Sequence, residues 1–378
     1  MKDVMGLIYT SKNEITLREL TVSRAVAALP VAGRYRMIDF ILSSMVNSGI
    51  RNVGVIMQKN YHSLMDHLGS GKEWDLHTRN DGLFILPPFL TRENIGTYSG
   101  IMDAIRSNMG YLRRSRQEYV ILTNSHTALN CRFDDMLAFH EDNGADITLV
   151  YSRKKLSELD QTTTLTPRHV FLQVADNGQV TDLEVGSENP SSENFYMDIL
   201  LIKRTLLMQL IDQCFAQSYT NFTRDLLQRY VHNGILRVCG YEYKGYNHRV
   251  ETINGYYNMN MEMLNPAIRR EMFHDNPVYT KVRDEVPARY LPGAKAINSL
   301  VADGCVIDGV VENSILFRGV HVCKGTHIKN SIVMQESVIG AGCEIEHTIL
   351  DKKVTVRDDS RLIAPMQYPI VIGKGTVI

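Results

Sequence analysis

The C-terminal part of the chain repeats an apolar residue every six positions, a rhythm that few folds can use. Nine positions carry it, in three coils of about 17 residues: Leu316, Val322 and Ile328; Val333, Ile339 and Ile345; Leu350, Val356 and Leu362. A half-buried strand has a period of 2 and an amphipathic helix one of about 3.6, so a step of six with Gly, Asp, Asn and Cys between predicts short strands turning a three-sided solenoid. We expect a parallel β-helix, which closes a chain and stacks on neighbouring subunits.

Composition places this solenoid in a larger, nearly neutral chain. At 378 residues the sequence is longer than one core usually organises, so two domains are expected. With 41 basic and 42 acidic residues and no block of like charge, nucleic acid and anionic membranes are poor partners. The first apolar run is too short for a signal peptide and no run approaches the roughly 20 residues of a membrane span, which predicts a cytoplasmic protein. The six cysteines form no CxxC pair, so neither a zinc site nor a disulfide framework is expected.

Residues 1–257 alternate between apolar runs and helical patterns. The runs that predict buried strands are Val4–Tyr9, Val53–Met57, Tyr119–Leu122, Ile147–Tyr151 and Phe195–Ile202. Such alternation favours an α/β, doubly wound sheet, in which ligands usually lie beyond the carboxyl ends of the strands. Residues 258–290 are charged and rich in proline, which predicts a linker, and residues 291–378 form the solenoid.

A long segment near the N-terminus resembles a known family. Arg24–Phe40 reads RAVAALPVAGRYRMIDF and is followed by Leu42–Ile50; together they are similar to the N-terminal signature of glucose-1-phosphate adenylyltransferases (ADP-glucose pyrophosphorylases). The match continues through Gln58, His62–Leu64 and Gly100–Ala104, and the solenoid matches the family's C-terminal domain. The resemblance implies a nucleotidyltransferase-like, doubly wound mixed sheet followed by a left-handed parallel β-helix. Catalytic members join glucose 1-phosphate to ATP, giving ADP-glucose and pyrophosphate for glycogen or starch synthesis.

The positions that carry this chemistry in the family are changed here. The segment that should cradle the triphosphate, Gly6–Glu14, has one glycine, no arginine and a glutamate that would repel phosphate. Ser125 stands where the family's Gly-Asp-His motif places a metal-binding aspartate, and Arg249 replaces a second metal-binding aspartate. Serine is a weak Mg²⁺ ligand and arginine repels the ion, although Glu251, two positions on, could restore a carboxylate to the same strand face.

A fourth family position is also altered, whereas two arginines are retained. The sugar-phosphate lysine should lie near Leu183–Ser187, which contains no lysine. Arg24 and Arg36 match arginines that bind phosphorylated-sugar effectors in the family, and a guanidinium fork suits phosphate. Each has a plainer alternative, because Arg36 could pair with Asp39 and Arg24 could cap or pair at a helix end.

Three hypotheses follow. The first is a non-catalytic, GlgD-type regulatory subunit, which the chain resembles; it would pair with a catalytic ADP-glucose pyrophosphorylase subunit, as a heterotetramer, and modulate it through differential contacts. Self-association is an alternative assembly. On this reading the chain binds no metal or cofactor, and Mg²⁺ belongs to the catalytic partner. The second is an active adenylyltransferase in which Glu14 and Glu251 replace the lost chemistry. The third is a purely structural scaffold.

Overall fold

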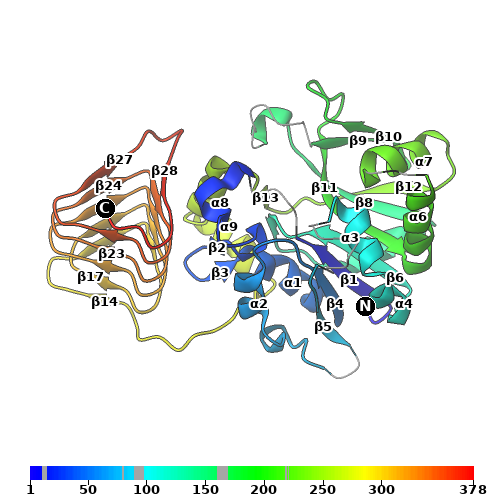
Figure 1. Ribbon diagram of the computed structural model, residues 1–378. Coiled ribbons are helices and arrows are strands. Elements are labelled where there is room, and N and C mark those ends of the chain that lie inside the picture. Colours follow the sequence, from blue (N-terminus) through cyan, green and yellow to red (C-terminus); the bar gives the residue numbers. More distant parts are fainter. Residues whose placement is uncertain (11–14, 79–80, 89–97, 160–168, 218, 220) are drawn as a thin grey trace.

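The computed structural model describes residues 1–378 except 11–14, 79–80, 89–97, 160–168, 218 and 220. Figure 1 shows two parts side by side, a domain built on a central sheet and a solenoid of stacked coils. In the part of the chain that is described, no helix is both long and apolar enough to cross a membrane.

The first domain is built on a mixed sheet. Its described strands lie in the order β10-β9-β11-β6-β1-β4-β5, with β8 paired to β11 and β12. β1 runs parallel to β4 and β6, whereas β11 runs antiparallel to β6 and β8. All five predicted strands are present, which confirms the predicted fold class. The strand bounds are β1 (Val4–Tyr9), β4 (Asn52–Ile56), β5 (Gly82–Leu86), β6 (Tyr119–Asn124), β8 (Ile147–Arg153), β9 (Val170–Val174), β10 (Val180–Val185), β11 (Asn194–Lys203) and β12 (Val238–Glu242).

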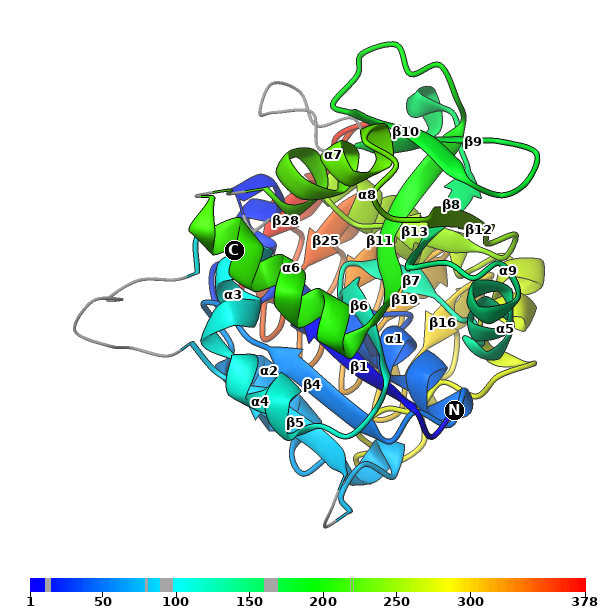
Figure 2. The same cartoon turned by 90° about the vertical axis from the view of Figure 1, so that its right-hand side faces the viewer.

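Helices cover both faces of this sheet, because its strands alternate apolar side chains between two cores. Met5 and Leu7 of β1 enter one core, which contains residues of α3 (Ile101–Ser107), α4 (Met109–Arg114) and α6 (Arg204–Ala216). Val4 and Ile8 enter the other, which contains residues of α1 (Met37–Asn47), α2 (His62–Leu68) and α5 (Asp134–Asp142). Figure 2 shows α6 and α3 in front of the sheet. The sheet is therefore doubly wound.

Shorter elements complete the first domain. Two antiparallel pairs of short strands, β2 with β3 and β7 with β13, lie outside the main sheet. The bounds are β2 (Pro30–Val31), β3 (Tyr35–Arg36), β7 (Thr127–Leu129), β13 (Asn247–Arg249), η1 (Ile15–Thr21), η2 (Val26–Ala28), η3 (Lys72–Trp74), η4 (Leu156–Glu158), η5 (Phe222–Leu227) and α7 (Gln228–His232).

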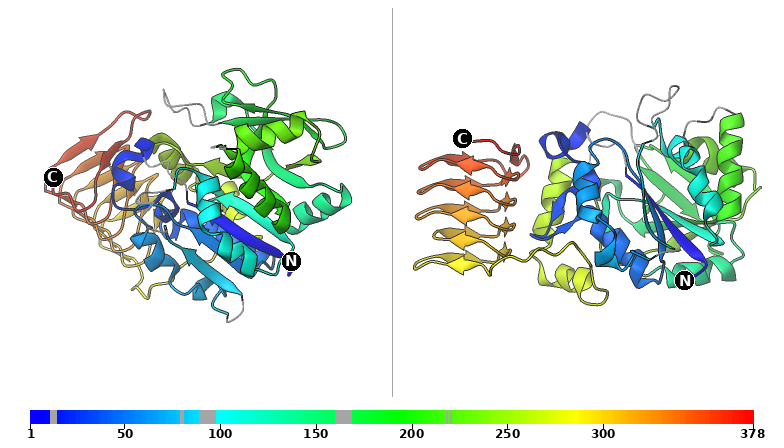
Figure 3. Two further views of the ribbon diagram at one scale, coloured as in Figure 1. Left: turned by 45° about the vertical axis from the view of Figure 1, so that its right-hand side comes forward. Right: turned by 60° about the horizontal axis from the view of Figure 1, so that its bottom comes forward.

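The solenoid confirms the six-residue rhythm. Leu316 pairs with Val333 and Val333 with Leu350, so equivalent apolar residues of successive coils stack in register. Val322 with Ile339, and Ile328 with Ile345, do the same on the other two sheets. Three parallel five-stranded sheets result, and Figure 3 shows their coils edge-on. The strand bounds are β14 (Arg289–Tyr290), β15 (Lys295–Ile297), β16 (Leu300–Val301), β17 (Val306–Ile307), β18 (Val310–Glu312), β19 (Ile315–Leu316), β20 (His321–Val322), β21 (His327–Lys329), β22 (Ile332–Val333), β23 (Val338–Ile339), β24 (Glu344–Glu346), β25 (Thr348–Leu350), β26 (Thr355–Val356), β27 (Arg361–Ile363) and β28 (Ile370–Ile372).

A continuous apolar core joins the two parts. Two helices, α8 (Ile253–Glu262) and α9 (Pro266–Phe273), lie between the sheet domain and the solenoid (Figure 1). Tyr256 and Met259 of α8 share one buried cluster with Phe317 and Met334 of the solenoid. The predicted linker, residues 258–290, spans the end of α8, all of α9 and the first solenoid strand β14; its boundaries stay predictions. The solenoid is thus packed against the N-terminal domain through a shared apolar cluster.

Candidate functional site

The structure brings together the changed positions of the expected active site. Ser125 directly follows β6, and Arg249 on β13 pairs in register with Thr127 on β7, so both lie just beyond the carboxyl end of β6. The Val250 N–H donates to the His126 carbonyl at 2.8 Å and fixes this arrangement. In doubly wound folds, ligands usually bind at this edge of the sheet, beyond the carboxyl ends of the strands.

Arg249 is held between two carboxylates. Its Nη1 lies 2.8 Å from Oδ2 of Asp198, and its Nε donates to Oε1 of Glu251 at 2.9 Å. Arg249 is 10% and Glu251 5% exposed, whereas Asp198 is 35% exposed. We call this group the Asp198–Arg249–Glu251 triad. Charge-assisted hydrogen bonds at these distances are among the strong ones, and they engage both carboxylates at once.

The charges of the triad stabilise one another. Burial alone would lower the pKa of Arg249, but the Asp198 and Glu251 carboxylates outweigh burial and raise it. Burial alone would raise the pKa of Glu251, but the Arg249 guanidinium outweighs it and lowers that pKa. Both groups are therefore charged at neutral pH. Glu251 shares the site with Arg249, as its spacing suggested, but it is a partner of the arginine.

Asp198 was missed by the sequence analysis. It lies within β11, where the pairing with β8 shifts register between Tyr196 and Leu200, and its φ of 55° is left-handed. Such a bulge turns a strand residue away from its regular direction, and aspartate tolerates the left-handed region better than most residues. The available signal was one acidic residue inside an otherwise apolar strand.

The donor set does not fit Mg²⁺. This ion prefers oxygen ligands in near-octahedral geometry, but here both carboxylates of the triad are engaged by Arg249, whose positive charge offsets one of their two negative charges and repels a cation. Ser125 is buried, and its Oγ has no hydrogen-bond partner among the described residues. Across those residues, no group of three or more His, Cys, Asp or Glu side chains is arranged to hold a metal ion. The second half of the predicted triphosphate loop, residues 11–14 with Glu14, lies outside the described residues.

The space beside the triad is small and contains a lysine from another strand. A cavity of about 30 Å³ is lined by Lys154, Phe195, Arg249 and Glu251, among others. Lys154 follows β8, and its Nζ donates to the Asn247 carbonyl at 2.5 Å. Burial lowers the pKa of Lys154, which nearby glutamates partly oppose. The Leu183–Ser187 segment, where the family lysine was sought, spans the end of β10.

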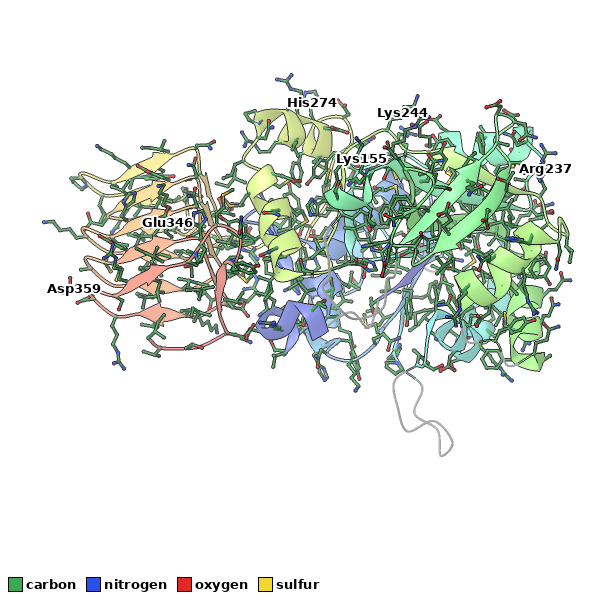
Figure 4. The ribbon with its side chains drawn as sticks, turned by 90° about the horizontal axis from the view of Figure 1, so that it is seen from above. Lys155, Arg237, Lys244, His274, Glu346 and Asp359 are labelled. Atoms are coloured by element: carbon green, nitrogen blue, oxygen red, sulfur yellow. The ribbon has the colours of Figure 1, made fainter. Side chains whose placement is uncertain are left out.

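A larger cleft of about 580 Å³ adjoins this cavity, but its charges are balanced. Arg153 pairs with Glu242 at 3.1 Å, and Glu262 accepts hydrogen bonds from Tyr246 at 2.6 Å and from His248 at 3.1 Å. Lys244 also lines this cleft. Figure 4 shows Lys244 on the first domain, far from the solenoid residues Glu346 and Asp359. This cleft therefore offers no net charge to a phosphate.

A second region collects cations from both domains. A cavity of about 310 Å³, which we call the cation pocket, is lined by Ser23, Arg36, His62, Ser63, Asp66, His67, Lys281, Arg283, Arg318 and Lys374. Five of these side chains are lysine or arginine and one is a carboxylate. Burial and the surrounding cations lower the pKa of Arg36 to about 10, against the opposing effect of Asp39. Uncompensated cations around one cavity are typical of a site for a multiply charged anion.

Arg36 is fixed at the wall of this pocket by the first domain. Its guanidinium Nη1 donates to the carbonyl and to Oγ of Ser63, at 2.7 and 3.0 Å. Its backbone N–H donates to Oδ2 of Asp39 at 2.9 Å, which caps α1. Arg36 therefore does pair with Asp39, but through its backbone N–H. This leaves part of its guanidinium group for a ligand.

Arg24 lies elsewhere. Its Nη2 donates to the carboxylate of Asp351 of the solenoid, at 2.8 Å from Oδ1 and 2.7 Å from Oδ2. The two side chains are 2% and 1% exposed. Arg24 is not among the residues that line the cation pocket. Arg24 thus joins the N-terminal signature to the solenoid. The expectation that Arg24 pairs with another side chain fits this geometry better than the expectation that it contacts a ligand.

Comparisons with known proteins agree with this architecture. Residues 16–160 match the family described as nucleotidyl transferase, and residues 287–363 match the GlmU-like C-terminal hexapeptide family, as expected for a left-handed parallel β-helix. The glycogen biosynthesis protein GlgD of Bacillus subtilis is 36% identical over 99% of this chain and 96% of its own length. GlgD of Geobacillus stearothermophilus is 35% identical over 99% and 97%. The glucose-1-phosphate adenylyltransferase of Thermomicrobium roseum is 36% identical over 94% and 82%. The chain belongs to the glucose-1-phosphate adenylyltransferase family.

Proposed function

We propose that this chain is a regulatory, catalytically inactive subunit of ADP-glucose pyrophosphorylase in glycogen biosynthesis. The Asp198–Arg249–Glu251 triad is the observation that carries the proposal. Nucleotidyl transfer from ATP needs a divalent cation to neutralise the charge that develops on pyrophosphate. In this chain a fixed guanidinium holds the carboxylates beside the site, so the chain retains the scaffold without the metal chemistry.

The relatives support the same proposal. Two GlgD proteins match essentially the whole chain, and both carry glycogen biosynthesis in their names. A regulatory subunit needs a partner, and we propose a catalytic homologue, in a heterotetramer. The outward edges of β14, β15 and β16 have no further strand beside them among the described residues, and Tyr290 and Ile297 at this end are about half exposed. Open strand edges with apolar residues favour packing against another subunit.

The proposal is tested by co-expression with the catalytic homologue. A tag on this chain is expected to recover both subunits in one complex, whose maximal rate or substrate affinity exceeds that of the homologue alone. A complex with unchanged kinetics would leave only the scaffold hypothesis, and failure to form a complex would overturn the regulatory role.

The cation pocket supports a second part of the proposal, binding of a phosphorylated-sugar effector. Arg36 offers a guanidinium fork, and Lys281, Arg283, Arg318 and Lys374 surround the same cavity. Because Arg318 and Lys374 belong to the solenoid whereas Arg36 belongs to the first domain, a bound phosphate would bridge the two domains. That gives effector binding a route to the packing of the solenoid, and hence to a partner subunit.

Replacing Arg36 with alanine is expected to weaken effector binding about ten- to a hundredfold. The estimate follows from the loss of charge-assisted hydrogen bonds worth about 1.5–3 kcal/mol. Response of the assembled enzyme to a series of phosphorylated sugars measures it. Arg34→Ala is the matched control, because Arg34 is exposed and is not among the residues lining the cavity. Equal responses in the two variants would refute the effector role of Arg36.

A further inference from the structure

A buried histidine lies at the wall of the cation pocket. His67 on α2 lines the cavity, and its Nε2 lies 2.5 Å from Oδ1 of Asp39 on α1. The other oxygen of Asp39 accepts the backbone N–H of Arg36. One buried carboxylate therefore holds both an anion-binding arginine and a titratable ring. The ring also contacts Trp74 edge-on, which fixes its orientation.

A lysine of the solenoid flanks the same pocket. The Lys352 carbonyl accepts a hydrogen bond from the Gly375 N–H at 2.9 Å, directly beside Lys374 of the pocket. The Lys352 N–H donates to Oδ1 of Asp351, at 2.7 Å. The backbone of Lys352 therefore joins Asp351 of the buried pair to the segment that carries Lys374 of the pocket.

Cations lie close to both groups, and His67 also has carboxylates nearby. His67 faces Asp39 and Arg36 from the first domain and Lys281 from the segment before the solenoid, with Asp66 and His62 on its own helix. Burial, then Arg36 and Lys281, lower its pKa, while Asp39 opposes them. Lys352 faces Arg36, Arg24, Lys374 and Asp351. Burial, followed by Arg36 and Arg24, lowers the pKa of Lys352 to about 7.

We infer that anion binding in the cation pocket is coupled to proton uptake at His67 and Lys352. The inference rests on the proposed effector function of this pocket and adds its regulation. A dianion offsets the repulsion that each group feels from the neighbouring cations, so both groups hold a proton more tightly when the pocket is filled. Binding therefore takes up protons and strengthens as the pH falls.

The direction of the pH dependence of anion affinity, and the pH range in which it appears, follow from the pKa values of His67 and Lys352 in the empty and in the filled pocket. A group whose pKa rises on binding adds affinity that is fully present below its free pKa and is lost as pH rises through its pKa in the complex. For Lys352 the loss begins near pH 7. For His67 it begins below its ordinary value of 6.5. A rise of about one pH unit in either pKa changes affinity about tenfold.

Sulfate is the suitable probe, because its charge stays −2 across this range whereas phosphate esters titrate within it. Isothermal titration of sulfate into the full chain from pH 5.5 to 9, at constant ionic strength and in buffers of different ionisation enthalpy, measures affinity and protons together. We expect affinity to fall by tenfold or more across this range, with net proton uptake. His67→Gln, whose amide can still donate to Asp39, should remove the uptake below pH 6.5, and Lys352→Met the uptake near pH 7.

His62→Gln is the matched control, because His62 lines the same cavity but is exposed. It should bind and take up protons like the wild type. Sulfate binding with no proton uptake and a constant affinity would overturn this inference and leave the effector function intact. The absence of sulfate binding at every pH would overturn the effector function and this inference with it. Unaltered uptake in both His67→Gln and Lys352→Met would show that other groups titrate.

Discussion

Replacing Arg24 with alanine will destabilise the chain by about 3–5 kcal/mol, because it leaves Asp351 charged and without its partner in the apolar contact between the two domains. Arg24 and Asp351 are nearly inaccessible to solvent, and Nη2 of Arg24 lies within hydrogen-bond distance of both carboxylate oxygens of Asp351. At this buried position, solvent water does not reach the Asp351 carboxylate to replace the guanidinium. Urea unfolding followed by circular dichroism measures the change in the free energy of unfolding.

An exposed ion pair of the same solenoid gives the matched control for Arg24→Ala. Arg361 and Glu344 lie 2.8 Å apart but are 73% and 56% exposed. Arg361→Ala should therefore cost less than about 1 kcal/mol. The double variant Arg24→Met with Asp351→Leu should recover most of the stability, since it removes both buried charges. Equal losses for Arg24→Ala and Arg361→Ala would contradict the role assigned to the buried pair.

Replacing Arg249 with alanine will have the second large effect, a loss of about 3 kcal/mol at neutral pH. Two carboxylates then face each other without the cation that now separates them. The pKa of Glu251 will rise, because burial is no longer outweighed by Arg249. Thermal unfolding of the variant and the wild type at pH 7 and pH 4 measures the loss and its dependence on pH.

The sign of this pH dependence is fixed by the lowered pKa of Glu251. In the wild type, the Arg249–Glu251 interaction contributes stability that is present above the unfolded pKa of glutamate, about 4.3, and is lost as pH falls through the lower folded value. In Arg249→Ala the folded pKa lies above the unfolded one, so stability falls as pH rises. The difference in stability between the wild type and Arg249→Ala should therefore shrink toward pH 4. Adding Glu251→Gln to Arg249→Ala should narrow this difference at pH 7. A gap that is independent of pH would contradict the triad's electrostatic role.

The solenoid and the strands of the sheet could be predicted because their periods are local properties of the sequence. Leu316, Val333 and Leu350 are 17 positions apart, and the structure stacks them in register. The resemblance placed Ser125 and Arg249 at one site, and they do lie at the same end of β6.

The parts that could not be predicted depend on contacts between distant segments. Asp198 reaches Arg249 only because a bulge turns it out of an apolar strand, and strand alternation does not reveal bulges. Arg24 was expected to bind an effector or to cap or pair at a helix end, and its actual partner Asp351 lies 327 positions away. The cation pocket is likewise assembled from both domains and the segment between them. No local pattern marks residues whose common property appears only after folding.

Pyrophosphate release by the purified chain alone, from ATP, glucose 1-phosphate and Mg²⁺, tests the central claim most directly. With the catalytic homologue as positive control, the account predicts no turnover by this chain at any Mg²⁺ concentration, because Arg249 engages both carboxylates beside the site and repels the ion. Turnover that requires Mg²⁺ and disappears with Glu251→Gln would contradict the account and make Glu251 a metal ligand.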